Sequence, residues 1–261
     1  MYRNIKRVVT AASRYFSTGE SHVADVLSVD GYCPICEQAV TFSAKNEWLR
    51  DYFLCSGCGS IPRERALMSV INDYHPDYRE LEIHESSPGG RGVSVKLHKE
   101  CARYSASHFY PDQPLGAIHR RHGYQCENME KLTFADNSFD LFITQDVLEH
   151  IYDPEKAFRE IARVLRPGGA HIFTVPLINK SSKTERWASL GEDAKPVFHH
   201  EPEFHGNPID PDGSPVTMHW GYDIAEYIMF VSGLPTTIIM IDDLNAGIRA
   251  EYIEVLVSKA P

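Results

Sequence analysis

The stretch CENMEKLTFADNSFDLFITQDVLEHIYDPEKAFREIARVLRPGGAHIFTVP, residues 126–176, decides the fold of this chain of 261 residues. Residues 139–144 form an apolar run preceded by turn residues, which predicts a buried parallel strand. Asp153 is the expected N-cap of a helix, because apolar residues recur at helical spacing after it, up to the Pro-Gly-Gly of residues 167–169. Residues 170–175 predict the next strand. The stretch therefore predicts one crossover unit of a doubly wound α/β sheet.

Polar residues follow the first of these strands directly. Ligands of open α/β sheets bind at the carboxyl ends of strands, so Gln145, Asp146, Glu149 and His150 are expected to face a ligand. The phrases FDLFITQDVLEH and RVLRPGG resemble the second half of a class I S-adenosylmethionine-dependent methyltransferase, of the methyltransferase type 11 kind. The resemblance covers roughly residues 67–261 and is most specific in the opening stretch. It implies a seven-stranded, mostly parallel, doubly wound Rossmann-like sheet whose last strand is antiparallel.

The resemblance also implies where the cofactor binds. Residues 81–85 take the place of the family's first strand and residues 86–92 that of its glycine-rich loop, but the usual alternation of an acid and glycines is absent. Glu85 or Glu82 is expected to hold the ammonium group of the cofactor. The residues expected to bind the cofactor are Glu85, Ser86, Gly89, Ser107, Asn128, Met129, Gln145, Asp146 and His150.

Two of these residues carry an open alternative. Ser107 stands where the family holds an acid for the ribose hydroxyls, and His108 or a water is the alternative contact. Asn128 resembles the residue that accepts a hydrogen bond from the adenine amino group, since an amide oxygen is also an acceptor. A turn-capping role for Asn128 is the other interpretation.

Four of the six cysteines form two closely spaced pairs. Two residues separate Cys33 from Cys36 and Cys55 from Cys58. Such pairs turn both sulfur atoms toward one point, and two pairs supply the four thiolates of a tetrahedral zinc site. Because four protein ligands leave no position for water, the zinc is expected to be structural. The remaining two cysteines suggest a reducing compartment.

Length and composition predict one main domain with a small appendage. We divide the chain into a basic N-terminal arm (1–30), a four-cysteine module (31–66) and a methyltransferase domain (67–261). The arm is expected to pack against the body or a second subunit of a homodimer, and a transit peptide is the less favoured interpretation. A helix is expected from Pro62 to Tyr74, in which Arg63 and Arg65 either contact an anionic ligand or remain solvated. The last two strands, residues 235–242 and 252–258, are expected to form a hairpin-like pair with the final strand at the sheet edge.

Residues 177–220 are expected to form an acceptor lid, because a long segment rich in Pro, Gly, His and Asp inside a compact domain is usually functional. Imidazoles suit proton removal near neutral pH, so His205 or His200 is the predicted general base, with Asp146 or Glu149 orienting it. His199 and His219 belong to the same group of histidines. A second metal ion bound by these histidines is a less favoured alternative.

These features predict an enzyme that methylates a small-molecule or glycan acceptor, at an oxygen atom, in the cytoplasm. The formal charge of −10 disfavours a nucleic-acid partner, and no apolar run is long enough to enter a membrane. Two alternatives stay open. One is an RNA methyltransferase that uses the zinc module for RNA recognition, and the other is a non-catalytic cofactor-binding protein.

Overall fold

The computed structural model describes residues 25–207 and 209–261. The basic residues of the predicted N-terminal arm, Arg3, Lys6, Arg7 and Arg14, lie outside the described residues. In the part of the chain that is described, no helix has the length and apolar character needed to cross a bilayer.

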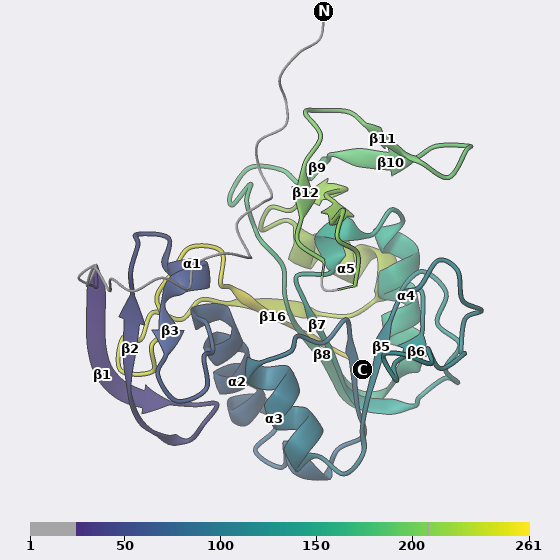
Figure 1. Ribbon diagram of the computed structural model, residues 1–261. Coiled ribbons are helices and arrows are strands. Elements are labelled where there is room, and N and C mark those ends of the chain that lie inside the picture. Colours follow the sequence, from purple (N-terminus) through teal and green to yellow (C-terminus); the bar gives the residue numbers. More distant parts are fainter. Residues whose placement is uncertain (1–24, 208) are drawn as a thin grey trace, which may run out of the picture.

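A seven-stranded sheet forms the centre of the molecule (Figure 1). Its spatial order is β15-β16-β8-β7-β4-β5-β6. The strands from β6 to β8 are parallel, and β16 is antiparallel to both of its neighbours. In chain order this is 3-2-1-4-5-7-6, which confirms the predicted fold class. The strands are β4 (Ile83–Ser86), β5 (Tyr104–His108), β6 (Gln125–Cys126), β7 (Phe139–Gln145), β8 (Leu165–Thr174), β15 (Thr236–Ile239) and β16 (Val255–Lys259).

The prediction that the final strand forms the sheet edge was wrong. Strand β16 lies between β8 and β15, so β15 is the edge strand. The physical reason is the composition of β16, in which Val255, Leu256 and Val257 are all buried. A continuous apolar run belongs inside a sheet, where both faces are covered. The predicted hairpin-like pairing of the two strands is confirmed.

Helices cover both faces of the sheet. Alternate residues of a strand point to opposite faces, and along β7 Leu141 and Ile143 join one hydrophobic core while Phe142 joins the other. The first core contains α2 and α3, and the second contains α4 and α5. Asp153 caps α4 as predicted, because its side chain accepts a hydrogen bond from the Lys156 amide at 3.2 Å. The helices are α2 (Pro62–Tyr74), α3 (Gly92–Glu100), α4 (Pro154–Val164) and α5 (Ile224–Ser232), with short 3-10 turns η1 (Tyr78–Glu80) and η2 (Leu148–His150).

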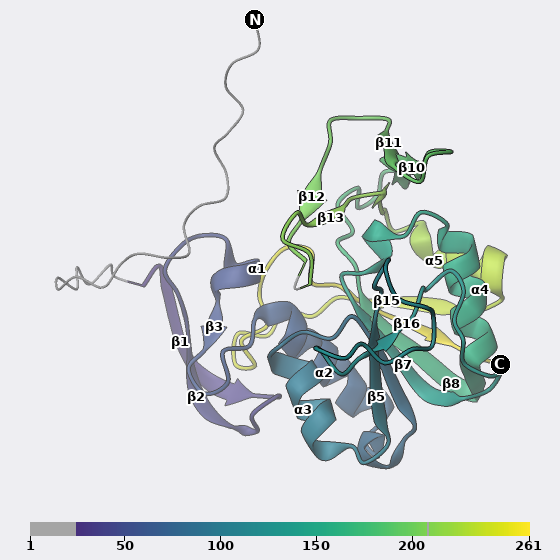
Figure 2. The same ribbon diagram turned by 45° about the vertical axis from the view of Figure 1, so that its right-hand side comes forward.

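The four-cysteine module is an antiparallel sheet that shares its core with the main domain. Strands β1 (Leu27–Cys33), β2 (Gln38–Ala44) and β3 (Leu54–Cys55) follow one another in space, and the one-turn helix α1 (Leu49–Tyr52) precedes β3. Figure 2 shows this module beside α2. Phe42 and Phe53 are fully buried in the same core as Leu67 and Leu141. The module is therefore packed into the body of the protein.

Arg65 ties this core together. Its guanidinium group is fully buried and donates hydrogen bonds to the carbonyls of Phe53 (2.7 Å), Ser60 and Gly247 (2.6 Å), and it lies over the ring of Phe42. Burial lowers the pKa of Arg65 to about 10, against the opposing effect of the nearby cysteines. The prediction that Arg65 contacts an anionic ligand or remains solvated was wrong, because all of its donors point into the protein.

Residues 177–220, the segment predicted to form an acceptor lid and called the lid below, contain short strand pairs. Within residues 177–220, three two-stranded ladders lie above the ends of the sheet strands (Figure 1). Thr217 then donates its backbone N–H to the Glu149 carbonyl at 2.7 Å, which fixes the returning lid against η2. The ladders are β9 (Glu185–Arg186) with β14 (Met218–His219), β10 (Ala188–Leu190) with β11 (Pro196–Phe198), and β12 (Phe204–His205) with β13 (Ser214–Pro215).

Candidate active site and cysteine cluster

A cavity of about 1120 Å³ opens at the carboxyl ends of β4, β5 and β7. We call it the cleft. Its size is slightly above the range of about 300–1,000 Å³ that is common for ligand pockets. Its wall is formed by the loop after β4, the loop between β5 and β6, the segment after β6, the turn after β7, the start of α2 and the lid. The four-cysteine module adds Trp48, Arg50 and Asp51.

Most of the residues predicted to bind the cofactor lie in the cleft wall. They come from different strand ends, as expected for a doubly wound sheet. Asn128 accepts a hydrogen bond from the Glu130 amide at 2.8 Å, so its oxygen also caps a turn, as the alternative interpretation proposed. The predicted cofactor residues in the wall are Ser86, Gly89, Asn128, Met129, Gln145, Asp146 and His150.

Glu85 and Ser107 do not reach the cleft wall, which corrects two of the predicted contacts. Glu85 is fully buried and accepts hydrogen bonds from Ser94 (2.6 Å), Tyr104 (2.7 Å) and Gln145 (2.8 Å). Burial raises the pKa of Glu85, while these three donors oppose the effect.

The hydroxyl of Ser107 is also fully buried and lies 2.9 Å from His84 Nε2. Its neighbour His108 lines the cleft instead, which agrees with the alternative contact named for the ribose. Burial lowers the pKa of His108 to about 4, so this imidazole is neutral at neutral pH.

Asp146 lies in the cleft wall, but arginines already hold its carboxylate. Arg50 is 2.6 Å away and Arg63 is 2.9 Å away, and Thr174 donates a hydrogen bond at 2.9 Å. Burial alone would raise the pKa of Asp146, but Arg63 and Arg50 lower it to about 2. Tyr252 accepts a hydrogen bond from Arg50 through its carbonyl at 3.1 Å. Asp146 is therefore not free to orient a histidine.

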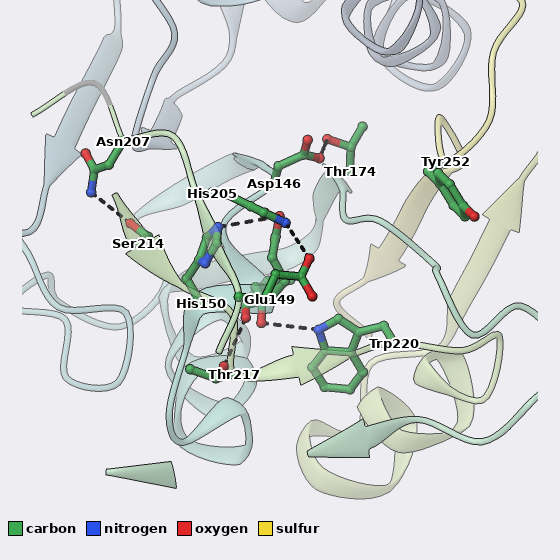
Figure 3. Close-up of polar contacts among 12 residues, drawn as sticks. Asp146, Glu149, His150, Thr174, His205, Asn207, Ser214, Thr217, Trp220 and Tyr252 are labelled. Atoms are coloured by element: carbon green, nitrogen blue, oxygen red, sulfur yellow. Dashed lines mark hydrogen bonds and ion pairs between the residues drawn. The ribbon is translucent and has the colours of Figure 1, made fainter. Parts of the chain in front are cut away.

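The predicted base His205 lies beside Glu149 and His150 in the cleft (Figure 3). His205 Nδ1 is 3.6 Å from Glu149 Oε1, and the rings of His205 and His150 are 5.1 Å apart. His205 Nε2 is 3.2 Å from Glu203 Oε1. Glu149, followed by Glu203, raises the pKa of His205, although 3.6 Å is too long for a hydrogen bond and the attraction is ionic.

His200, the other predicted base, does not reach the cleft. Its ring stacks on Trp187 with a centroid distance of 4.1 Å, and its Nε2 lies 3.1 Å from Glu185. The prediction for His200 is wrong, because its contacts with Trp187 and Glu185 hold the side chain away from the cavity. His199 Nε2 lies 2.8 Å from the hydroxyl of Ser189. His219 also stacks on Trp187, with a centroid distance of 3.8 Å.

Sequence reasoning missed several residues of the cleft. Arg50 belongs to the four-cysteine module, and nothing in its sequence neighbourhood indicates a contact with Asp146. The loop between β5 and β6 also contributes aromatic rings, since Tyr110 stacks on His119 at 4.2 Å and His122 lies next to both. The dense run of aromatic and basic residues at 119–124 was the available signal.

The four cysteines converge as predicted. Their sulfur atoms all lie within 4.8 Å of one another, with Cys33 and Cys58 3.8 Å apart and Cys36 and Cys55 3.7 Å apart. A tetrahedral zinc site with Zn–S bonds of about 2.3 Å places its sulfur atoms about 3.8 Å apart. The donor set and its spacing therefore fit one zinc ion.

The central part of the chain is similar to a known protein family. Residues 88–173 match the family described as "Methyltransferase domain". A relative from Pasteurella multocida, the ubiquinone/menaquinone biosynthesis C-methyltransferase UbiE, is 27% identical over 67% of this chain and 63% of its own length. The ubiquinone biosynthesis O-methyltransferase of Parvibaculum lavamentivorans is 31% identical over 27% of each chain. The chain thus spans less than two thirds of the length of these relatives.

Among solved structures, an S-adenosylmethionine-dependent methyltransferase from Mesorhizobium loti aligns over 74% of this chain and 97% of its own, with 17% identity and a TM-score of 0.45. The strand order found here carries the fold assignment independently of that alignment. The chain thus has a seven-stranded sheet with the Rossmann-like methyltransferase fold, and its residues 88–173 match the methyltransferase domain family.

Proposed function

We propose that this protein transfers a methyl group from S-adenosylmethionine to a hydroxyl oxygen of a small-molecule or glycan acceptor. The observation that carries the proposal is the cleft itself. The loop after β4 and the Asn128 segment line it together with the lid and its His205. A cofactor and an acceptor can therefore occupy one cavity that spans from the strand ends to the lid.

Methyl transfer depends more on the alignment of the cofactor with the acceptor than on covalent chemistry by the protein. S-adenosylmethionine supplies a methyl group that its sulfonium already activates. The acceptor oxygen forms the new C–O bond while the C–S bond breaks, and the electron pair of that bond stays on sulfur. The cleft holds the two reactants in line and the lid excludes water, which together supply the proximity that such a reaction requires.

The hydroxyl proton needs an acceptor on the protein. His205 takes this proton in the proposed reaction, because it lies in the cleft wall beside Glu149. The neighbouring carboxylates raise the pKa of His205 and make it a stronger base. Glu149 takes the orienting role that Asp146 cannot fill.

We further propose that the four cysteines hold a structural zinc ion. This zinc stabilises the module that supplies Arg50 to the cleft, and it takes no part in the reaction because four thiolates complete its coordination. The other two cysteines, Cys101 and Cys126, are buried and free, which is compatible with a reducing compartment such as the cytoplasm.

Calorimetry with S-adenosylmethionine and its demethylated product tests the first step of this proposal. We expect saturable binding in the micromolar range. An absence of binding would identify a non-catalytic protein of another kind. Transfer of labelled methyl groups to candidate alcohols and glycans tests the second step, and His205→Ala should reduce turnover while leaving cofactor affinity unchanged. A preference for RNA with steep salt dependence would overturn the proposed acceptor class.

A further inference from the structure

Glu149 is a buried carboxylate without a matching donor. Its side chain is 2% exposed, and neither carboxylate oxygen has a hydrogen-bond partner among the described residues. A buried carboxylate in this condition costs several kcal/mol unless a cation or a donor approaches it. Its main chain is fixed, since the Glu149 carbonyl accepts hydrogen bonds from both the amide and the hydroxyl of Thr217.

His150 directs a lone pair toward this carboxylate. Its Nδ1 lies 2.9 Å from the carbonyl oxygen of Pro215. A carbonyl can only accept, so Nδ1 carries the hydrogen and Nε2 carries the lone pair in the neutral ring. This Nε2 lies 3.7 Å from Glu149 Oε1. Two basic atoms therefore face each other in the cleft wall.

His205 repeats the arrangement from the lid. Its Nε2 faces the carboxylate of Glu203 at 3.2 Å, which favours the hydrogen on that nitrogen. The lone pair then lies on Nδ1, at 3.6 Å from the same Glu149 oxygen. Each imidazole thus has an outer partner on its far nitrogen, a pattern that is typical of histidines that bind metal ions.

We propose that Glu149, His150 and His205 bind one divalent transition-metal cation in the cleft, and that this cation binds the oxygen of the acceptor. The three ligand atoms lie within 4.8 Å of one another. Metal–ligand bonds of about 2.1 Å require ligand atoms about 3.0–3.4 Å apart. The two contacts to Glu149 would shorten by a few tenths of an ångström, and the two imidazole nitrogens, which lie within 4.8 Å of each other, would approach to the same range. The inference rests on the proposed function and deepens it.

The ligand set indicates the class of cation. Two imidazoles and one carboxylate suit Zn²⁺, Fe²⁺ or Mn²⁺ better than Mg²⁺ or Ca²⁺, which prefer oxygen ligands. Three protein ligands leave coordination positions open, and all three residues line the cleft. A hydroxyl bound at an open position loses its proton more easily. The cation then replaces His205 as the group that activates the acceptor, and the proton passes to solvent.

Metal titration of the full chain, with its cysteine-bound zinc in place, tests the site directly. Zn²⁺ and Mn²⁺ are added separately and followed by calorimetry, and the metal content is measured after desalting. We expect one binding event beyond the cysteine site. Glu149→Gln and His205→Gln each remove a ligand, so the dissociation constant should rise by at least about 100-fold. Glu203→Gln removes an outer partner and should cost about 10- to 100-fold.

His200→Gln is the matched control, because it replaces an imidazole of the same lid that lies outside the cleft, and it should bind the cation as the unchanged protein does. Folding is checked by thermal melting in the presence of a chelator too weak to remove the cysteine-bound zinc. There Glu149→Gln should melt no lower than the unchanged protein, since its buried carboxylate has no hydrogen bond to lose among the described residues. Added cation should raise the melting temperature only where Glu149 and His205 are both present.

Two results would overturn the cation site. One is the absence of saturable binding of either ion, and the other is equal binding by the unchanged protein and by His205→Gln. Neither result touches the proposed methyl transfer, in which His205 would remain the base. Conversely, cation binding that depends on Glu149 in a protein that does not bind S-adenosylmethionine would keep the site and remove the proposed function.

Discussion

Arg65 offers the sharpest test of how the four-cysteine module is joined to the domain. Its guanidinium donates to the carbonyls of Phe53, Ser60 and Gly247, which come from three separate segments. Arg65→Met keeps the apolar stem but leaves the carbonyls of Phe53 and Gly247 without a donor, each at a cost of about 1–3 kcal/mol, while the Ser60 carbonyl keeps its hydrogen bond from the Cys55 amide. Relaxation of the structure around the new side chain, and the removal of a buried guanidinium charge, reduce this total cost. We expect the free energy of unfolding to fall by about 2–4 kcal/mol.

Urea denaturation of the zinc-loaded protein, followed by far-ultraviolet circular dichroism, measures this loss. Arg65→Lys should fall between the two proteins, because an ammonium group keeps the charge but lacks the planar fork that reaches several carbonyls. Arg249→Met is the control, since Arg249 is half exposed and pairs with the exposed Asp242, and it should have little effect. A change below about 1 kcal/mol for Arg65→Met would refute the reasoning, because two unpaired buried acceptors should together cost more than that.

Two further predictions concern the zinc ion and the glycine-rich loop. Metal analysis should find one tightly held zinc ion per chain at the four cysteines. Cys58→Ser should lose most of this zinc, whereas Cys101→Ser, which changes a buried cysteine outside the cluster, should keep it. Equal zinc content in the two variants would refute the proposed zinc site. Gly92 has φ of +60°, and a Cβ there would collide with the Glu64 carboxylate, so Gly92→Ala should lower the unfolding free energy by at least about 1 kcal/mol. Gly90→Ala meets no atom within 4 Å and should change little, and similar melting curves for the two variants would contradict this view of the loop.

Local patterns made the sheet and the cysteine cluster predictable from sequence. The strand at β7, the cap at Asp153 and the cysteine spacing each depend on residues close together in the chain. The direction of single side chains was harder to predict. Ser107 and His108 are neighbours on one strand, so they point to opposite faces, and only His108 reaches the cleft.

Contacts between distant segments left no local signal. Arg50 and Asp146 are 96 residues apart in sequence, yet their side chains meet at 2.6 Å. The position of the last strand is a different case, because the run of Val255, Leu256 and Val257 already indicated burial on both faces. His200 and His205 are equally plausible bases by composition, and only the ladders of the lid separate them.

The core shared by Phe42, Phe53 and Leu67 bears on how this protein can be shortened or recombined. A fragment that begins at residue 67 would expose the apolar side of α2 and would lack both arginines that pair with Asp146. Grafting the lid and the sheet strands onto another scaffold would likewise separate them from the four-cysteine module and from the core that they share with it. The seven-stranded domain is thus not a portable unit, and loss of the proposed zinc ion would destabilise the whole protein instead of one accessory segment.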